Sequence, residues 1–452
     1  MNKQGTLGLF SFSVEAALSA LTRHELMSSP PGTTRKRRRS PRQPRRHPPP
    51  PVPAAKPPSI TLPEEIIEEI LSRVPVKAVT RLLCLSSHWN SLLSSSRFMK
   101  HHLLSSSSRP RLLGGIYPHT SLECRTLSLS RPLSTLIQNP SLDPPLFLHP
   151  PLNVGPVPRI VGCVNGLICW IHRFHDNYFH YLNPATGGKA TSPCIRRSMT
   201  GDSVFMHGFG YDPLRDGYKT VLIDCNTAVD DKAAVVKVYT LGSPSSWRKI
   251  AGFPFVPKDY ETHTDGHLGR FVCGAVNWLA ERADESLMIV SVDLVEETCR
   301  EFSLPPADEG DGFVDCENLW ALGGCLCFSY DLDGLKFVVW QMKTYGASES
   351  WAKLFNITYT DVGIDPVTNF FPQTLFMVDK GVVLFDSDKD SVFVLYDIEQ
   401  KSYKELEFDN NGVWFNTNTY IESLVCPTRY LRYRGRGSAA TLPIGVRKAL
   451  TN

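Results

Sequence analysis

Three histidines fall within the short stretch HRFHDNYFH, where His172, His175 and His180 could together hold a metal ion. Such a site needs three or four ligands that converge on one point. In an extended strand, however, side chains alternate between two faces, so His172 and His175 point in opposite directions. We therefore expect a polar hairpin loop at this stretch and no bound metal.

The twelve cysteines offer a second kind of ligand, but none of them forms a CxxC pair. Cys325 and Cys327 would share one face of a strand, and two thiolates are fewer than the four ligands of a structural zinc site. We expect small apolar thiols in a protein of a reducing compartment. The sequence also contains no GxxxxGK(S/T), GxGxxG, HExxH or GxSxG motif. We therefore predict a protein that is not an enzyme and has no cofactor.

Basic residues are concentrated at the two ends of the chain, although the net charge is only +3. Residues 1–58 contain eleven Lys and Arg against two Glu, and residues 427–452 contain six against no acid. Residues 30–58 have almost no large apolar side chain, so they cannot offset the entropy of ordering and should be disordered. Their RKRRRSPRQPRR core resembles a nuclear-import signal or a nucleic-acid patch, and the alternative is a solvated tail that carries no targeting signal. We expect a location in the nucleus, the cytoplasm or both.

A strongly patterned helix follows this tract in LPEEIIEEILSRVPVK, residues 62–77. Thr61 and Glu64 form a T-x-x-E capping box, Pro63 suits the first turn, and Pro75 ends the helix. The apolar residues recur at helical spacing, at Ile66, Ile67, Ile70, Leu71 and Val74. The pattern therefore predicts an amphipathic helix with a well-defined start and end.

Two more helical patterns follow, over residues 76–85 and 86–104. We expect Leu82, Trp89 and Leu92 to hold the helices together. Three helices in so short a segment form a very small core, below the size that is comfortable without a partner. Part of the apolar surface is therefore predicted to be a docking surface.

From about residue 110 the pattern alternates, with runs rich in Val, Ile and aromatic residues between Gly, Asp, Asn and Pro. Hairpin glycines recur every 50–57 residues, at Gly115, Gly166, Gly217, Gly274, Gly324 and Gly381. Strand-end residues recur as well, at Asn183, Leu241, Asp293, Tyr345 and Asp397. Such a period with several strands per unit is typical of propeller blades. We predict six blades, the first at residues 110–160, with a curved β-sandwich as the alternative.

The helical stretch LPEEIIEEILSRVPVKAVTRLLCLSSHWNSLL resembles an F-box, the module by which substrate receptors attach to the Skp-family adaptor of Skp-cullin-F-box ubiquitin ligases. One departure is Ser87, where plant members often have a basic residue before the tryptophan. The resemblance implies an adaptor-binding surface formed by Leu62, Pro63, Ile66, Ile70, Leu71, Val74 and Pro75.

The β region resembles the F-box-associated domain of the large plant F-box family, from about residue 161 to 425. The matching pieces occur in the expected order: GCVNGLICW, YLNPATG, FGYDPLRDGYKTV, VYTLGSPSSWRKI, GAVNWLA, SVDLVEETCREFSLP, VWQMKTYGASESWAKLF and YIESLV. Asn277 departs from a histidine that is common at its place, so no role of that histidine is transferred. The resemblance implies a kelch-like β-structure that recruits a target protein.

These observations predict an α+β multidomain chain, with a small three-helix F-box followed by an all-β, kelch-like six-bladed propeller. The expected parts are a disordered basic region at 1–58, the F-box at 59–104, the F-box-associated domain at 105–426 and a disordered basic tail at 427–452. The predicted function is that of a substrate-recognition subunit of a ubiquitin ligase. It would bind the Skp-family adaptor, cullin through that adaptor, and an unidentified target protein.

Two other functions are open on the sequence. A kelch-like metal oxidase would need Tyr, His and Cys side chains that converge at the propeller axis. A nucleic-acid-associated factor would act through RKRRRSPRQPRR and the stretch TRYLRYRGRGSAATLPIGVRK, whose Arg and Tyr could stack on single strands, but we do not expect this partner. No run approaches the roughly 20 apolar residues of a spanning helix, so we expect no membrane partner either.

Overall fold

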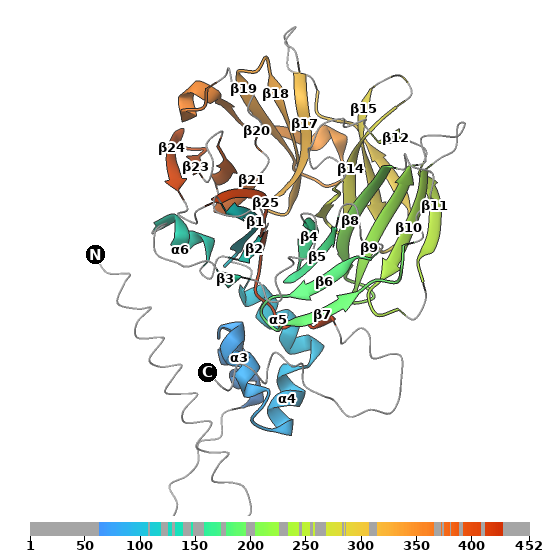
Figure 1. The fold of residues 1–452 in the computed structure, drawn as a ribbon, viewed down its shortest axis with the longest axis vertical. Helices are drawn as coiled ribbons and strands as arrows, with labels where there is room; N and C mark the ends of the chain where they lie inside the picture. The colour runs from blue at the N-terminus through green and yellow to red at the C-terminus, as the bar shows by residue number, and fades with distance from the viewer. Residues whose placement is uncertain are drawn as a thin grey trace, which may run out of the picture.

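The computed structural model describes residues 63–427 with several gaps. The longer gaps are 119–124, 139–145, 148–157, 196–203, 226–233, 258–267, 307–313 and 366–371. Figure 1 shows a small bundle of helices and, above it, a ring of β-sheets. The basic regions predicted at 1–58 and beyond 427 lie outside the described residues, as do Thr61 and Leu62. Among the described residues, no helix has the length and apolar character needed to cross a membrane.

Four short helices form the bundle, namely α2 (Glu64–Ser72), α3 (Val76–Leu82), α4 (Ser87–Leu93) and α5 (Ser96–Ser106). The helix predicted over 86–104 is thus two helices, and the prediction of three helices is wrong. Serine hydroxyls explain the break. Ser86 Oγ accepts the N–H of Trp89 at 3.3 Å, and Ser95 Oγ accepts the N–H of Phe98 at 3.1 Å. Each hydroxyl caps a new helix start, so α4 and α5 begin separately.

Five sheets of the β region consist of antiparallel strands that follow one another along the chain, except that β12 and β13 both pair with β14. The first contains β4 (Pro158–Val164), β5 (Leu167–His172), β6 (His180–Asn183) and β7 (Gly188–Thr191). The second contains β8 (Val204–Asp212), β9 (Gly217–Cys225), β10 (Ala234–Thr240) and β11 (Arg248–Phe253). The third contains β12 (Val256–Pro257), β13 (Arg270–Val272), β14 (Ala275–Glu281), β15 (Leu287–Asp293) and β16 (Cys299–Phe302). The fourth contains β17 (Val314–Leu322), β18 (Cys325–Leu332), β19 (Lys336–Met342) and β20 (Trp351–Thr358). The fifth contains β21 (Leu375–Asp379), β22 (Val382–Asp386), β23 (Val392–Asp397) and β24 (Ser402–Glu407).

The sixth sheet combines the two ends of the β region, in the order β25 (Gly412–Tyr420), β1 (Arg111–Pro118), β2 (Arg125–Ser128) and β3 (Leu146–Phe147). A short helix, α6 (Leu133–Gln138), lies between β2 and β3 in the chain. The prediction that residues 110–160 form a blade by themselves is therefore wrong, because one strand of this sheet comes from the C-terminal end. Gly115 lies inside β1, opposite Thr126 and Phe415, and is not a hairpin glycine.

The sheets form a closed ring, because each packs on its two neighbours through an apolar cluster (Figure 1). Leu113 and Ile168 lie between the sixth and first sheets, and Leu112 and Leu384 lie between the fifth and sixth. The innermost strands also touch in succession, from β25 through β4, β8, β13 and β17 to β21. The β-propeller prediction is confirmed and the curved β-sandwich is wrong. Five blades are continuous repeats, whereas the sixth sheet is composite.

Turn geometry explains the residue types that repeat at the strand ends. Asn183, at the end of β6, accepts the backbone N–H groups of Ala185 and Thr186 on its Oδ1. Asp293 and Asp397 each accept two backbone N–H groups in the same way, at the ends of β15 and β23. Four hairpins need a glycine because φ is 80–82° there, at Gly166, Gly274, Gly324 and Gly381. The predicted markers are confirmed at these positions.

Candidate functional site

Helix α2 carries two apolar rows that face in different directions. Ile67, Leu71 and Val74 lie four and three residues apart and belong to the core of the helical module. Leu71 is 0% exposed and Val74 is 2% exposed. Ile66, in contrast, is 48% exposed, and Pro63 before the helix is exposed as well. One row therefore holds the module together and the other meets solvent.

The seven residues predicted to bind an adaptor are divided between these rows. Four of them are exposed or half-buried, and we call them the outward row: Pro63, Ile66, Ile70 and Pro75. Leu71 and Val74 instead lie in the core, because a module this small must use part of α2 for its own packing. Leu62 lies outside the described residues. Adaptor binding by these residues stays a prediction, and the outward row is the part that solvent reaches.

The outward row rests on a well-packed core. Leu82, Trp89 and Leu92 are at most 8% exposed, which confirms that these residues hold the helices together. His102 of α5 adds a hydrogen bond within the module, because its Nε2–H donates to the backbone oxygen of Val74 at 2.8 Å. Burial lowers the pKa of His102, against the opposing effect of this hydrogen bond. The neutral imidazole is therefore favoured here.

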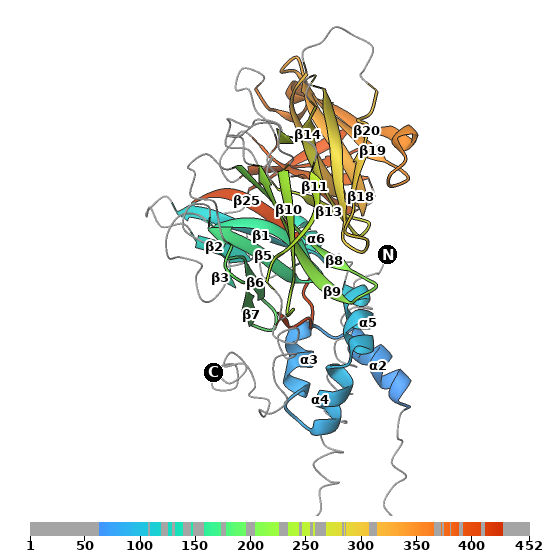
Figure 2. The ribbon, with the colours of Figure 1, turned by 90° about the vertical axis from the view of Figure 1, so that its right-hand side faces the viewer.

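The segment that follows β25, residues 421–426, joins the helical module to the ring (Figure 2). We call this segment the strap. Its Leu424 is 6% exposed and is part of the core of the helical module. On either side of Leu424, Asn183 Nδ2 donates to the backbone oxygens of Ser423 and Val425, at 3.0 and 2.6 Å. One asparagine of the first sheet thus fixes the strap on both sides of the residue that enters the module.

The strap also contacts the turn between β4 and β5 closely. Ser423 Oγ donates to the backbone oxygen of Asn165 at 2.7 Å. A Cβ added at Gly166 would lie 2.6 Å from the backbone oxygen of Ile421, nearer than real Cβ atoms approach. Sequence reasoning found YIESLV only as a piece of a family pattern and missed this role. The strap and its partners are more than two hundred residues apart, and a local pattern does not reveal such contacts.

The ring has a face of short turns and a face of long connections. The turn after β4 contacts the strap, and the turn after β8 carries Asp216, which pairs with Lys100 of α5 at 3.4 Å. Strands alternate in direction within each antiparallel sheet, so β9 ends and β10 begins at the opposite face. β7 and β16 also end there, and β8 and β17, which open the next sheets, begin there. We call this side the long-loop face, and it points away from the helical module.

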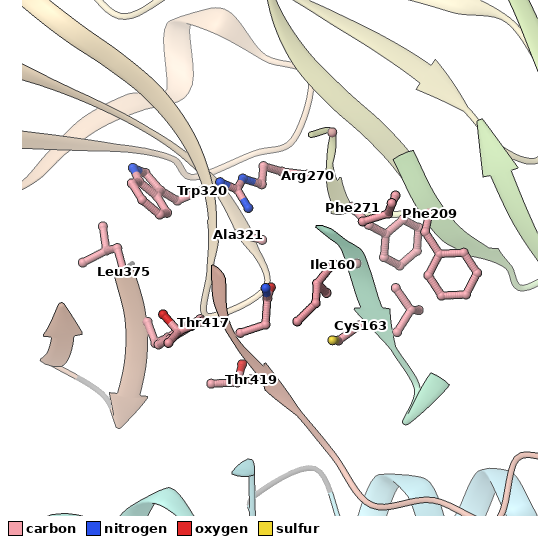
Figure 3. Close-up of a pocket in the computed structure, with 16 residues that line it drawn as sticks. Ile160, Cys163, Phe209, Arg270, Phe271, Trp320, Ala321, Leu375, Thr417 and Thr419 are labelled. Carbon is pink, nitrogen blue, oxygen red and sulfur yellow. The ribbon is translucent and has the colours of Figure 1, made fainter. Parts of the chain in front are cut away.

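A cavity of about 190 Å³ lies on the axis of the ring (Figure 3). All six innermost strands contribute residues to it, including Ile160, Phe209, Phe271, Ala321, Leu375 and Thr419. Most of the lining residues are aliphatic or aromatic, but polar atoms form more of the exposed wall than apolar atoms do. Figure 3 shows Arg270 of β13 reaching toward Trp320 of β17 at one side of this space.

The side chains at the axis do not fit the metal-oxidase alternative, which needs Tyr, His and Cys together. Among the described residues that line the cavity, Cys163 is accompanied by no histidine or tyrosine. Burial raises the pKa of the Cys163 thiol to about 12, so this thiol stays protonated at neutral pH. The described residues on the axis therefore offer no suitable donor set for oxidase chemistry.

Other potential metal ligands are also dispersed. His180 stacks on Trp170 with ring centroids 4.1 Å apart, and His175 lies outside the described residues. Cys325 and Cys327 are free thiols. Over the part of the chain that the structure describes, no three His, Cys, Asp or Glu side chains are grouped to hold a metal ion.

Buried charges between the second and third sheets serve the fold. Lys219, 1% exposed, lies 2.8 Å from both Asp212 and Glu297. Desolvation acts to raise the pKa of Asp212, but hydrogen bonds from Lys219 and Arg215 outweigh it and hold this pKa below its ordinary value. Arg215 also donates to the backbone oxygen of Val295 at 2.7 Å. The cluster therefore ties two neighbouring turns together.

Comparisons with known proteins agree with this two-part architecture. A model of the F-box domain matches residues 60–101, and a model of the F-box associated beta propeller domain matches residues 137–426. F-box protein At3g07870 of Arabidopsis thaliana is 27% identical over 403 residues, which cover 80% of this chain and 91% of the relative. F-box/kelch-repeat protein At3g23880 of the same plant is 27% identical over 383 residues, covering 81% and 96%.

A third relative, F-box protein CPR1 of Arabidopsis thaliana, is 25% identical over 390 residues, covering 81% of this chain and 89% of its own. Among solved structures, a chain from the nidogen/laminin complex covers 70% of this chain and 99% of its own, at 12% identity and a TM-score of 0.39. The propeller model, in contrast, matches more than half of the chain. The chain therefore belongs to the family of F-box proteins that carry an F-box-associated β-propeller domain, with relatives in plants.

Proposed function

We propose that this protein is the substrate-recognition subunit of a Skp-cullin-F-box ubiquitin ligase. The F-box binds the Skp-family adaptor, and cullin through it, while the ring binds a target protein. The observation that carries the proposal is the outward row, four apolar or proline residues that solvent reaches above an already complete core. Membership of the F-box family supports it, because members act as receptors rather than as catalysts.

The outward row offers enough apolar surface for a stable complex. Together with Leu62, its residues would contribute roughly 10 kcal/mol gross when buried, at about 1.5–3 kcal/mol for each large side chain. Association itself costs several kcal/mol. The remainder is sufficient for micromolar binding without a buried ion pair.

We propose that the target binds on the long-loop face, with the ring acting as one kelch-like receptor. The helical module and the strap cover the short turns of the first and second sheets, so the opposite face is the less obstructed one for a second protein. The strap holds the two parts in one orientation. A bound target would therefore stay at a constant distance from the adaptor, and ubiquitin transfer would be promoted by proximity.

The test compares two substitutions of exposed apolar residues. Ile66→Asp changes the outward row, and Leu214→Asp changes a residue of the ring that is 77% exposed. Ile66→Asp should abolish capture of a purified Skp-family adaptor, as should the double variant Leu62→Ala with Pro63→Ala, while Leu214→Asp should bind like the wild type. Circular dichroism checks that each variant is folded. Undiminished adaptor capture by both outward-row variants would falsify the assignment.

The location of the protein is a separate part of the proposal. We propose that it works in the nucleus, the cytoplasm or both, based on the basic tract at residues 35–46. A fluorescent fusion should lose nuclear signal when Arg37, Arg38 and Arg39 are changed to alanine. An unchanged distribution would show that this tract is not an import signal.

A further inference from the structure

A second space, of about 330 Å³, lies where the helical module meets the ring, and we call it the joint groove. Helix α5 forms one wall, and the turn between β8 and β9 forms the opposite wall. Figure 2 shows α5 beside the end of the ring at β8 and β9. Apolar atoms form most of the exposed wall of the groove. The side chains that matter most here are Met99, Leu103, Leu104, Tyr211, Pro213 and Val425.

Helix α5 uses its three faces differently. Phe98 and His102 are 0% exposed inside the module. Nε2 of His101, on the second face, lies 3.3 Å from a carboxylate oxygen of α2. Leu103 and Leu104 belong to the third face and line the joint groove. Leu104 is 71% exposed and is not part of the module core, so this face is apolar without contributing to the packing of the helices.

The wall on the ring side is held in place by its own contacts. The rings of Tyr211 and Tyr218 lie 5.0 Å apart between centroids, and Tyr218 is 2% exposed in the first cluster of the ring. The Tyr211 hydroxyl donates to Asp216 Oδ1 at 2.5 Å. Val425 of the strap is fixed by the hydrogen bond from Asn183 to its backbone oxygen. A preformed apolar wall binds a ligand with little additional ordering cost.

The charges and the size of the groove define its ligand. Among the described residues that line it, the charged side chains are Lys100 and Asp216, which pair with each other at 3.4 Å. A charged ligand would lose water without meeting an uncompensated charge, so a neutral ligand is favoured. The volume is about twice that of an engineered apolar cavity that holds benzene. Water against such a wall has few hydrogen-bond partners, and its displacement by an apolar group is favourable.

We propose that the joint groove is a binding site for a small, neutral, flat apolar molecule about the size of two fused rings. One side of the molecule packs against Leu103 and Leu104 of α5, and the other packs against Tyr211 and Pro213 of the ring. The molecule therefore bridges the two parts of the chain and stabilises their arrangement, because it binds only where both walls are present. The site does not depend on adaptor or target binding, and its test measures the bound molecule alone.

Calorimetry on the full-length protein tests the site, with 2-naphthol as the neutral probe and 2-naphthoate as its charged counterpart. 2-Naphthol should bind at least tenfold more tightly than 2-naphthoate. Leu104→Glu should weaken 2-naphthol about tenfold or more, since a carboxylate replaces part of the apolar wall. Leu85→Glu is the matched control, because Leu85 is 47% exposed in the module and does not line the groove. This control should leave the affinity unchanged.

A second pair of variants approaches the groove from the ring. Pro213 and Leu214 are exposed neighbours in one turn, and of these two Pro213 lines the groove. Pro213→Trp should fill the groove and abolish binding of 2-naphthol, whereas Leu214→Trp should not. Saturating 2-naphthol should also slow hydrogen exchange in α5 and in the turn between β8 and β9. Equal affinity for the two probes, or no effect of either groove variant, overturns the proposal.

Two other occupants of the groove are separated by further measurements. If 2-naphthol binds only after residues 428–452 are removed, the chain's own tail occupies the groove. If sedimentation shows a dimer that Leu104→Glu dissociates, a second copy of the chain occupies it. Either result overturns the small-molecule assignment, whereas a monomer that binds 2-naphthol with its tail present supports it.

Discussion

The helical module and the ring bury their apolar residues in different ways. The four helices share one cluster of ten residues, and one of these, Leu424, comes from the strap rather than from a helix. The ring has six clusters, one between each pair of neighbouring sheets. The module therefore depends on a contribution from the rest of the chain, whereas the ring distributes its core over many repeated contacts.

This difference explains why the joint between the two parts matters. A small module has a low free energy of unfolding. Because a strap residue is part of the module core, folding of the module is coupled to folding of the ring. Asn183 and the turn at Gly166 fix the strap to the first sheet. Substitutions in the module core, at the joint and at the periphery should therefore lower the free energy of unfolding by different amounts. They should also affect different parts of the molecule.

The largest effect is expected from Phe98→Ala in the module. Phe98 is 0% exposed, and replacing a buried phenylalanine by alanine costs about 3–5 kcal/mol. We expect the module to unfold while the ring stays folded, as measured by hydrogen exchange of the two parts. The matched control is Phe393→Ala, at a residue 1% exposed in one of the ring clusters, which should lower the ring's stability without unfolding it. Equal loss of protection in both parts for both variants would contradict the comparison.

A pair of glycines isolates the contribution of the joint. Gly166 and Gly274 have φ of 81° and 82°, so alanine at either position costs about 1–3 kcal/mol of backbone strain. Only at Gly166 would the new Cβ also meet the strap, at 2.7 Å from Ser423 Cβ, whereas nothing lies within 4 Å at Gly274. Gly166→Ala should therefore lower the free energy of unfolding more than Gly274→Ala, by about 1–3 kcal/mol. Denaturant titration measures this difference. Equal free energies of unfolding for the two variants would show that the strap can move away from the new Cβ without cost.

Asn183→Ala removes the hydrogen bonds on both sides of Leu424 and leaves two backbone oxygens buried. The expected loss is about 1–3 kcal/mol, with faster hydrogen exchange in the module. Asp397→Ala is the control, because Asp397 closes an equivalent turn in the fifth sheet without touching the strap. It should cost less than about 1 kcal/mol and leave the module unaffected. If the module exchanges at the same rate in both variants, Asn183 acts only as a turn residue.

The smallest effect concerns pH and the module alone. Burial lowers the pKa of His102, so below about pH 6.5 the unfolded chain binds more protons than the folded one. The free energy of unfolding should therefore fall as pH drops from 7.5 to 5.5, with Arg109 adding to the effect and Glu422 opposing it. His102→Asn should flatten this dependence, whereas His101→Asn, on a half-exposed neighbour, should not. A thermal-melting series in buffers of matched ionic strength measures both slopes.

Many local features of the fold could be predicted because they depend on residues close together in the chain. Pro75 and the spacing of apolar residues predicted α2, and the repeating glycines and Asn or Asp residues marked real turns. The capping box was wrong, because Pro63 is itself the N-cap of α2 and no side chain caps the helix start. The number of helices was wrong, since Ser95 caps a new helix in a segment that reads as continuous. The first blade was wrong because a strand from the far end of the chain completes it.

The candidate sites show the same division. Sequence spacing identified the apolar residues of α2, but the packing of α2 on its own module decided which of them face solvent. The strap and the joint groove could not be predicted, because their contacts join residues more than a hundred positions apart. Such contacts leave no periodic signal along the chain.

The sequence by itself therefore determined the order of the parts, the amphipathic start of the module, the turn positions and the family resemblance. These features follow from backbone preferences of Gly, Pro, Asn and Asp and from apolar periodicity, which act over a few residues. The tertiary structure decided the closure of the ring by β25, the outward row, the strap and the joint groove. Each of these depends on surfaces that meet only after the chain has folded.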